Sequence, residues 1–505
     1  MPIVRISLFT LALVGVSACG SSDARNDKAS SSSVKVPLLE YSTKSDEARR
    51  HVQEGERLDD TGFPLRANEE FKRAVAADSS FGYAYLRVAQ NAYSGDEYAT
   101  NVRRASAHVA TATPVEALLI QAEQKNDHND FAGALELLKK ATDLAPGNAR
   151  VRMMLGREYS LMLKVSETRA AFERALATDT TFARPMFWLA NSYLFQEPKD
   201  IAKAEQFALR GQKLWSREPV SYLWLGNVRR AQGRLEEAIA AYSREIELAP
   251  TDMQALDQRG SANAFAGHFD AARSDFDGAL RVAKPAERSG VGMDRGYLRA
   301  YQGDFDGALK DLADFRGAIA GLHTPSPEQD KLNLLYAELY IALLHGKFPM
   351  ADSAVAQFNA INRTLAKTSN SDGYVKWAEG FANHLDGLLA AYHGDFTTAR
   401  ARLADVQRAR STDKDDPTTA VQIHGLAGLI ALFQKNYSTA SRELALADPT
   451  NTQMHFLYWR ALAAEGQSQT AEEKDLLRRI ATYNFSAPEY AAVRYDAIQK
   501  LNSLQ

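Results

Sequence analysis

Apolar and polar residues follow a helical period along most of the chain, and one apolar pattern returns after 34 residues. Two short helices, each with one apolar face and a small residue at their contact, produce this spacing. The repeating unit is therefore predicted to be a helical hairpin. The pattern is clearest in two successive copies, Tyr222, Leu225, Gly226, Ala238, Tyr242 and Pro250, followed by Leu256, Arg259, Gly260, Ala272, Phe276 and Pro285.

Weaker copies extend the pattern in both directions. After Pro285 a shorter motif persists, in which Gly or Asn is expected to be the left-handed residue that ends the first helix. An aromatic residue then packs as the second helix begins. We predict about twelve hairpins between Ala48 and Leu477. The later motif stands at Gly303-Asp304-Phe305, Gly346-Lys347-Phe348 and Gly394-Asp395-Phe396, with worn copies at Asn436-Tyr437 and Gly466.

These matches divide the chain by repeat quality. Residues 46–285 hold well-matched repeats, and residues 286–480 hold degenerate ones. Residues 481–505 are expected to form a capping helix, because the last repeat of an array has no neighbour to cover its face. Ser486-Ala487-Pro488-Glu489 predicts a capping box with proline in the first turn of that helix.

The period and the Gly/Ala/aromatic/Pro skeleton resemble the tetratricopeptide repeat family. The resemblance implies an all-α chain, a right-handed α-solenoid of antiparallel hairpins with a degenerate C-terminal half. It also implies a concave groove, lined mainly by the first helix of each hairpin. The scarcity of β-branched, alternating runs agrees with an all-α class.

The N-terminus predicts export and lipidation. Arg5 precedes an apolar run from Ile6 to Val16, which is too short for a membrane span of about 20 residues. Val16-Ser17-Ala18-Cys19 resembles the lipobox of bacterial lipoproteins, which implies a lipid on Cys19, the one cysteine of the chain. We therefore expect a signal peptide at 1–18 and a flexible tether at 19–45. An ordinary signal peptide with an incidental cysteine is the alternative.

Location follows from the same resemblance. Gly20 after Cys19 favours the outer membrane, by similarity to lipoproteins of bacteria with two membranes. The predicted location is thus the bacterial cell envelope, with membrane attachment through the lipid anchor.

Composition and motifs argue against several functions. The 60 basic and 63 acidic residues give a formal charge of −3, which provides no basic footprint for nucleic acid. The sequence holds no HExxH, Gly-x-Ser-x-Gly or phosphate-binding Gly-Lys-Ser/Thr motif, and its ten histidines are scattered. We expect no catalytic residues, cofactor or metal.

The groove residues can be counted from Gly156, Ala190 and Gly226. In the family, positions one after and six before this small residue point inward, and those three before it line the same strip. The polar set suits an extended peptide, because Arg holds a carboxylate and Asn pairs with backbone amides. Ordinary solvated groove residues are the alternative. The predicted groove comprises Arg150, Arg157, Arg184, Asn191 and Asn227, with apolar Met153, Phe187 and Leu223 standing where the family's carboxylate clamp has Lys.

A second strip is aromatic. The same count in the degenerate half gives Met293, Tyr297, Tyr336 and Tyr340. These residues form either a ligand surface for peptide or glycan, or part of the core. The sequence therefore favours a membrane-anchored, non-enzymatic scaffold that binds a protein or peptide partner. A glycan- or nutrient-binding outer-membrane lipoprotein is the alternative, and an enzyme is a third reading without a motif.

Overall fold

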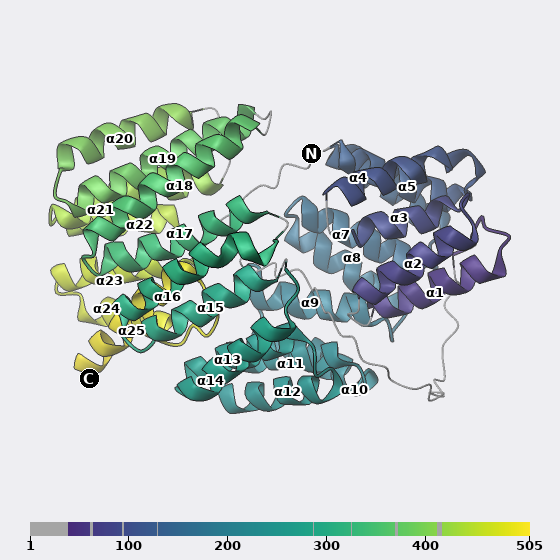
Figure 1. Ribbon diagram of the computed structural model, residues 1–505, viewed down its shortest axis with the longest axis horizontal. Helices are drawn as coiled ribbons and strands as arrows, with labels where there is room; N and C mark the ends of the chain where they lie inside the picture. The colour runs from purple at the N-terminus through teal and green to yellow at the C-terminus, as the bar shows by residue number, and fades with distance from the viewer. Residues whose placement is uncertain are drawn as a thin grey trace. The chain divides into compact units, whose positions relative to one another are not determined.

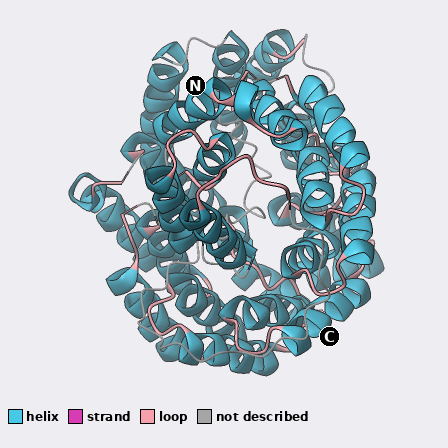
Figure 2. Ribbon diagram, turned by 90° about the vertical axis from the view of Figure 1, so that its right-hand side faces the viewer, coloured by secondary structure: helices cyan, strands magenta, loops and turns pink. Residues whose placement is uncertain are grey.

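The computed structural model describes residues 39–60, 64–92, 95–128, 130–285, 287–324, 326–368, 372–411 and 417–504. Within these residues every regular element is a helix, as Figures 1 and 2 show. The predicted signal peptide and Cys19 lie outside the described residues. No described helix is long and apolar enough to cross a membrane. The described chain forms two compact units, residues 39–259 and 260–504, which are called unit 1 and unit 2.

Unit 1 is a succession of antiparallel hairpins, and each hairpin packs against the next. Unit 1 ends inside α13, where unit 2 begins. Its helices are α1 (Asp46–Asp60), α2 (Pro64–Ala77), α3 (Gly82–Gln90), α4 (Gly95–Ala107), α5 (Pro114–Asp127), α6 (Phe131–Leu144), α7 (Ala149–Leu161), α8 (Val165–Thr178), α9 (Ala183–Phe195), α10 (Ile201–Leu214), α11 (Pro219–Ala231), α12 (Leu235–Leu248) and the first half of α13 (Met253–Ala266).

Unit 2 continues in the same way and ends in a single helix, α25. Through α24 the described helices pair consecutively, which gives the twelve hairpins that the sequence predicted and confirms the all-α, solenoid-like class. After α13 the helices are α14 (Phe269–Val282), α15 (Arg288–Ala300), α16 (Phe305–Ala318), α17 (Pro327–Leu344), α18 (Phe348–Thr368), α19 (Asp372–Tyr392), α20 (Phe396–Ala409), α21 (Pro417–Phe433), α22 (Tyr437–Ala447), α23 (Met454–Gly466), α24 (Thr470–Ala481) and α25 (Pro488–Ser503).

Small residues let the two helices of a hairpin approach closely. A Cβ atom on Gly260 would lie 2.9 Å from the ring of Phe276, and one on Gly156 would lie 2.6 Å from the ring of Phe172. Both distances are too short for carbon atoms in contact, so only glycine fits. The aromatic residue of the pattern thus packs on the glycine of its own hairpin.

The hairpin turns confirm part of the predicted motif and correct the rest. Gly303 and Gly394 have φ of +82° and +77°, the left-handed conformation that glycine adopts without strain. At the two worn copies, however, the left-handed residues are Lys435 and Ser468. Asn436 instead caps α22, and its Oδ1 accepts a hydrogen bond from the Thr439 N–H.

Gly466, also expected to be left-handed, is the last residue of α23 and lies against the ring of Tyr437. The predicted capping box of α25 is absent as well. Its N-cap is Ala487, and the cap makes no side-chain hydrogen bond. The Glu489 carboxylate, which would have closed the box, accepts a hydrogen bond from the Tyr336 hydroxyl instead.

The described end of the predicted tether, residues 39–45, packs against unit 1. The Ser42 N–H donates to both carboxylate oxygens of Glu116, at 3.2 and 3.1 Å. The Thr43 hydroxyl donates to Asp78 at 2.5 Å, and Thr43 is buried. The ordered array therefore begins before α1.

Candidate functional site: the inner surfaces of the two units

The predicted groove residues of unit 1 lie on α7, α9 and α11, the first helices of three successive hairpins. The apolar members, Met153, Phe187 and Leu223, are 5%, 5% and 2% exposed. The Phe187 ring stacks on Trp224, with 6.5 Å between ring centroids. These three side chains pack between helices and leave little apolar surface for a ligand to contact.

Two of the arginines bind carboxylates of α1. The Arg150 guanidinium donates to both oxygens of Asp60, at 3.0 and 2.6 Å, and its Nε lies 3.2 Å from Glu56 Oε1. Arg184 pairs with Asp59, which also accepts from Arg87 at 2.7 Å. The acidic C-terminal end of α1 therefore pairs with arginines of α7 and α9 on the inner surface of unit 1.

Burial and charge act in opposite directions on these carboxylates. Burial favours the neutral form of Asp59, but the charges of Arg184 and Arg87 outweigh it and lower the pKa of this carboxyl. Burial raises the pKa of Asp60, because it exceeds the opposing effect of Arg150. The cluster is thus an internal ion-pair network with Asp59 ionised at its centre.

Aromatic hydroxyls complete the cluster. Tyr83 and Tyr41 donate to Glu56 at 2.7 and 3.0 Å. Sequence reasoning missed Glu56, although the signal was present. Glu56 follows Gly55, the small residue of the first hairpin, and so holds the position counted for Arg157, Asn191 and Asn227.

The remaining polar groove residues differ in exposure. The Arg157 side chain is 40% exposed and lies 3.5 Å from Glu123. Asn191 is half-buried on α9. Asn227 is buried, and its Oδ1 accepts a hydrogen bond from the Tyr242 hydroxyl at 2.7 Å. Arg157 and Asn191 are therefore the members of the predicted set best placed to meet a partner.

The aromatic strip of unit 2 is largely internal. Tyr297, Tyr336 and Tyr340 are 2%, 8% and 3% exposed, while Met293 is half-buried. The Tyr336 hydroxyl donates to Glu489 of α25 at 2.6 Å. Burial raises the pKa of Glu489, and the hydrogen bond from Tyr336 opposes that shift. The strip is therefore largely part of the core, and α25 binds it at Tyr336.

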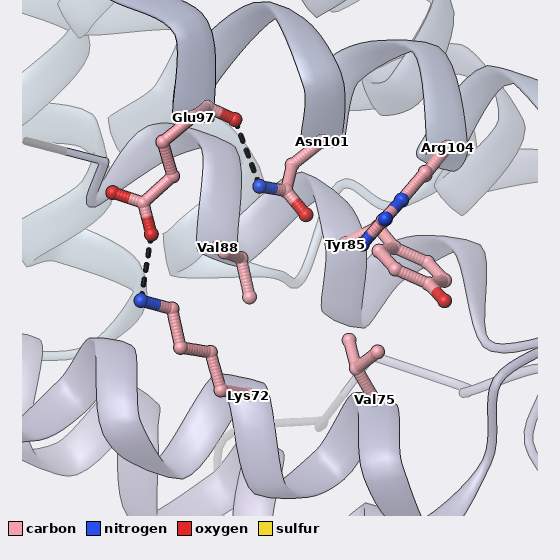
Figure 3. Close-up of a pocket in the computed structure, with 7 residues that line it drawn as sticks. All are labelled: Lys72, Val75, Tyr85, Val88, Glu97, Asn101 and Arg104. Carbon is pink, nitrogen blue, oxygen red and sulfur yellow. Dashed lines mark hydrogen bonds and ion pairs between the residues drawn. The ribbon is translucent and has the colours of Figure 1, made fainter. Parts of the chain in front are cut away.

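A hollow of about 290 Å³ lies among α2, α3 and α4 (Figure 3). Lys72 Nζ and Glu97 Oε1 lie 2.6 Å apart, and the Arg104 guanidinium lies over the Tyr85 ring at 5.9 Å. The Asn101 amide donates to the Glu97 carbonyl at 2.8 Å. The Lys72–Glu97 pair joins α2 to α4, whereas the Asn101 bond lies within α4. Among the described residues, no three His, Cys, Asp or Glu side chains gather so as to hold a metal ion.

Comparison with known proteins identifies one repeat directly. The family model of the tetratricopeptide repeat matches residues 219–252, which hold α11 and α12. The sequence resemblance is thus confirmed for this hairpin, which the pattern had marked as the clearest. No curated protein matches the chain.

Several solved structures are similar to parts of the chain. The crystal structure of MamA is 25% identical and covers 32% of this chain and 93% of its own, with a TM-score of 0.29. YrrB, described as a TPR protein with an unusual peptide-binding site, is 19% identical over 37% of this chain and 92% of its own, with a TM-score of 0.28. A tetratricopeptide repeat protein from Parabacteroides merdae is 16% identical over 62% and 98%, with a TM-score of 0.34.

Proposed function

We propose that this protein is a non-enzymatic, lipid-anchored scaffold of the bacterial cell envelope, and that the inner surface of unit 1 binds a segment of a partner protein. Cys19 would carry the lipid and Gly20 would direct the protein to the outer membrane. The unique cysteine at the end of a lipobox-like sequence supports the anchor. The stacked hairpins, one of them a tetratricopeptide repeat, support the scaffold.

One observation carries the assignment to unit 1. Arg150 and Arg184 project from successive first helices and each engages a carboxylate of α1. The inner face therefore already holds carboxylates by charge-assisted hydrogen bonds, which are the stronger kind. Arg157 and Asn191 continue this row and keep exposed surface. A partner segment with a carboxylate for Arg157 and a free backbone amide for Asn191 fits this chemistry.

The test is a double variant, Arg157→Ala with Asn191→Ala. Arg184 and Asn227 are left intact, because they bond to Asp59 and Tyr242 and their loss would disturb the fold. We expect partners crosslinked to the wild-type protein in native membranes to be lost from the double variant, with helicity unchanged by circular dichroism. Cys19→Ala should move the protein out of the membrane fraction.

The matched control is Lys140→Ala with Gln206→Ala, two exposed positions on the second helices α6 and α10. This variant should keep every partner. An identical set of partners in the double variant and the wild type would place binding elsewhere and contradict the groove assignment. A Cys19→Ala protein that stays with the membrane would contradict the anchor.

The aromatic strip of unit 2 gives the glycan alternative no support. An open aromatic strip would have supported it, but the rings of Tyr297, Tyr336 and Tyr340 are buried. A sugar ring stacks on an exposed aromatic face, which these three residues do not offer while α25 is in place.

A further inference from the structure

The last helix of the chain crosses the inner side of unit 2 as well as covering the last hairpin. α25 contacts α23 and α24, and it also contacts α15 and α17, more than 140 residues earlier in the chain. The Tyr490 ring lies 5.9 Å from the Phe265 ring and 6.1 Å from the Tyr301 ring, measured between centroids. One helix thus joins the first and last hairpins of unit 2.

The first turns of α25 are buried on all sides, since Tyr490 to Arg494 are buried in succession. Tyr490, Ala491, Val493 and Ala497 are fully buried, whereas Gln499 is exposed. The alanines bring the helix backbone close to the array, and the tyrosine is the large anchor at one end.

Polar contacts fix the helix along its length. The Tyr336 hydroxyl donates to Glu489 at 2.6 Å, and His345 Nε2 donates to the Ala492 carbonyl at 2.9 Å. Lys500 Nζ lies 2.7 Å from Glu465 Oε1. The groove supplies most of these groups from the first helices of its hairpins, the helices that line the inner face.

The fit leaves at least one inner hydroxyl unsatisfied. The Tyr297 hydroxyl is carried by α15, a helix that α25 contacts, and it is buried with no hydrogen-bond partner in a residue 2% exposed. A buried polar group without a partner costs about 1–3 kcal/mol. An occupant that offered this hydroxyl an acceptor would therefore gain free energy that α25 does not.

From these contacts we propose that the inner face of unit 2 is a helix-binding site which α25 occupies in cis, and that a partner protein docks there by inserting a helix in its place. The partner helix carries an acidic residue and then an aromatic one in its first turn, followed by a stripe of Ala and Val. This inference concerns unit 2, so it stands or falls separately from the function proposed for unit 1.

The short connection between α24 and α25 keeps α25 bound at this site. Residues 482–487 alone join α24 to α25, so the effective concentration of α25 at the groove is in the millimolar range or above. A helix supplied in trans must exceed this concentration, or α25 must be weakened. Binding in trans to the wild-type chain is therefore expected to be weak.

The test uses the full chain and a fluorescent peptide of residues 486–505. In the chain variant Tyr490→Ala, α25 loses its anchor while the groove stays intact. We expect this variant to bind the peptide at least tenfold more tightly than the wild-type chain does, by fluorescence anisotropy. The peptide that itself carries Tyr490→Ala should lose this binding.

The control chain is Gln499→Ala, which changes the exposed face of α25 and should bind the peptide as weakly as wild type. A folded Tyr490→Ala chain that binds no more tightly than wild type would overturn the proposal. If the variant does not fold, hydrogen exchange of the wild-type chain decides. Amides of α25 should be at least a hundredfold less protected than those of α21, and equal protection would overturn the proposal.

Discussion

His384 on α19 and His455 on α23 are two histidines enclosed by aromatic rings inside unit 2. They are 3% and 1% exposed, and the His455 ring lies 5.1 Å from the Tyr340 ring. His384 Nδ1 donates to the Gln422 carbonyl at 2.9 Å. Burial lowers the pKa of His384 to about 4 despite that bond, and burial together with the charge of His384 lowers the pKa of His455 to about 3.

These shifts predict loss of stability in mild acid. Below pH 6.5 the unfolded chain binds protons at both histidines while the folded chain does not, so the free energy of unfolding falls as pH falls toward 4. Each histidine contributes a slope of about 1.4 kcal/mol per pH unit. His384→Gln should remove one such slope between pH 6.5 and 5, measured by urea unfolding at several pH values.

His393→Gln is the control for this prediction. The His393 side chain is 40% exposed and lies 3.0 Å from Asp352. It should leave the pH slope as in wild type. Equal slopes in His384→Gln and wild type would show that His384 is not a buried neutral group in solution.

The residue type at a predicted groove position did not show whether its side chain is exposed. Met153, Phe187 and Leu223 were counted into the groove from their distance to a small residue, and all three are buried. An apolar side chain on the inner side of a first helix is pulled between neighbouring hairpins by the hydrophobic effect. Arg157 stays partly exposed because its charged end remains in water.

At the scale of the element, the hairpin turn is set by one left-handed residue and one cap. Asp304 and Asp395 of the Gly-Asp-Phe motif are the caps, accepting from Gly307 N–H at 2.9 Å and Thr398 N–H at 3.0 Å. The sequence motif contained this role, because Asp and Asn are preferred N-caps. Where the glycine is worn away, the turn keeps its shape and Lys435 adopts φ of +61°.

Lys435→Gly should therefore stabilise the protein. A non-glycine residue in the left-handed region costs about 1–2 kcal/mol, and the added freedom of glycine in the unfolded chain returns about 0.4–1 kcal/mol of this. The exposed Lys435 side chain has little packing to lose. A rise of about 0.5–1 kcal/mol in the free energy of unfolding is expected from urea titration.

Gly394→Ala is the reciprocal change. Gly394 has φ of +77°, and no atom lies within 4 Å of the position that a Cβ would take. Any loss of stability there comes from the backbone alone. Should Lys435→Gly destabilise while Gly394→Ala is neutral, the turn would not hold these left-handed residues in solution.

At the scale of the whole molecule, each unit is closed by a segment distant in sequence. Asp59 and Asp60 of α1 reach Arg184 and Arg150 in unit 1. Glu489 of α25 reaches Tyr336 in unit 2. In both units the chain itself covers part of the inner surface.

Asp59→Asn tests the closure of unit 1. Removing one partner of a buried ion pair leaves the other charge uncompensated and costs about 3–5 kcal/mol. Arg87, with a side chain 2% exposed, would bear most of this cost. We expect a lower urea midpoint and faster hydrogen exchange in α3 and α9, which Asp59 holds through Arg87 and Arg184.

Asp46→Asn is the matched control, because Asp46 pairs with Arg49 at the exposed start of α1, where the Asp46 side chain is 78% exposed. A surface pair contributes little, so the urea midpoint should not move. Equal effects of the two substitutions would show that the Asp59 cluster is solvated and does not close unit 1.

The sequence by itself determined the helical hairpin, its number of copies and the residues that pack within it. These features depend on neighbours less than 34 residues apart, where spacing translates directly into a helix face. The small residues and aromatics of the pattern found their partners as expected, at Gly260 and Phe276 for example. The left-handed turns were located to within one or two residues even in the worn copies.

Only the tertiary structure decided what the inner surfaces meet. Small rotations between hairpins add up along an array, and no local pattern encodes their sum. The accumulated rotation brings Asp60 to Arg150, which are 90 residues apart in the sequence. It also brings Glu489 to Tyr336, which are 153 residues apart. The curvature of a unit thus decides whether an inward-facing side chain is exposed or is covered by another part of the chain. Curvature is a property of the folded array.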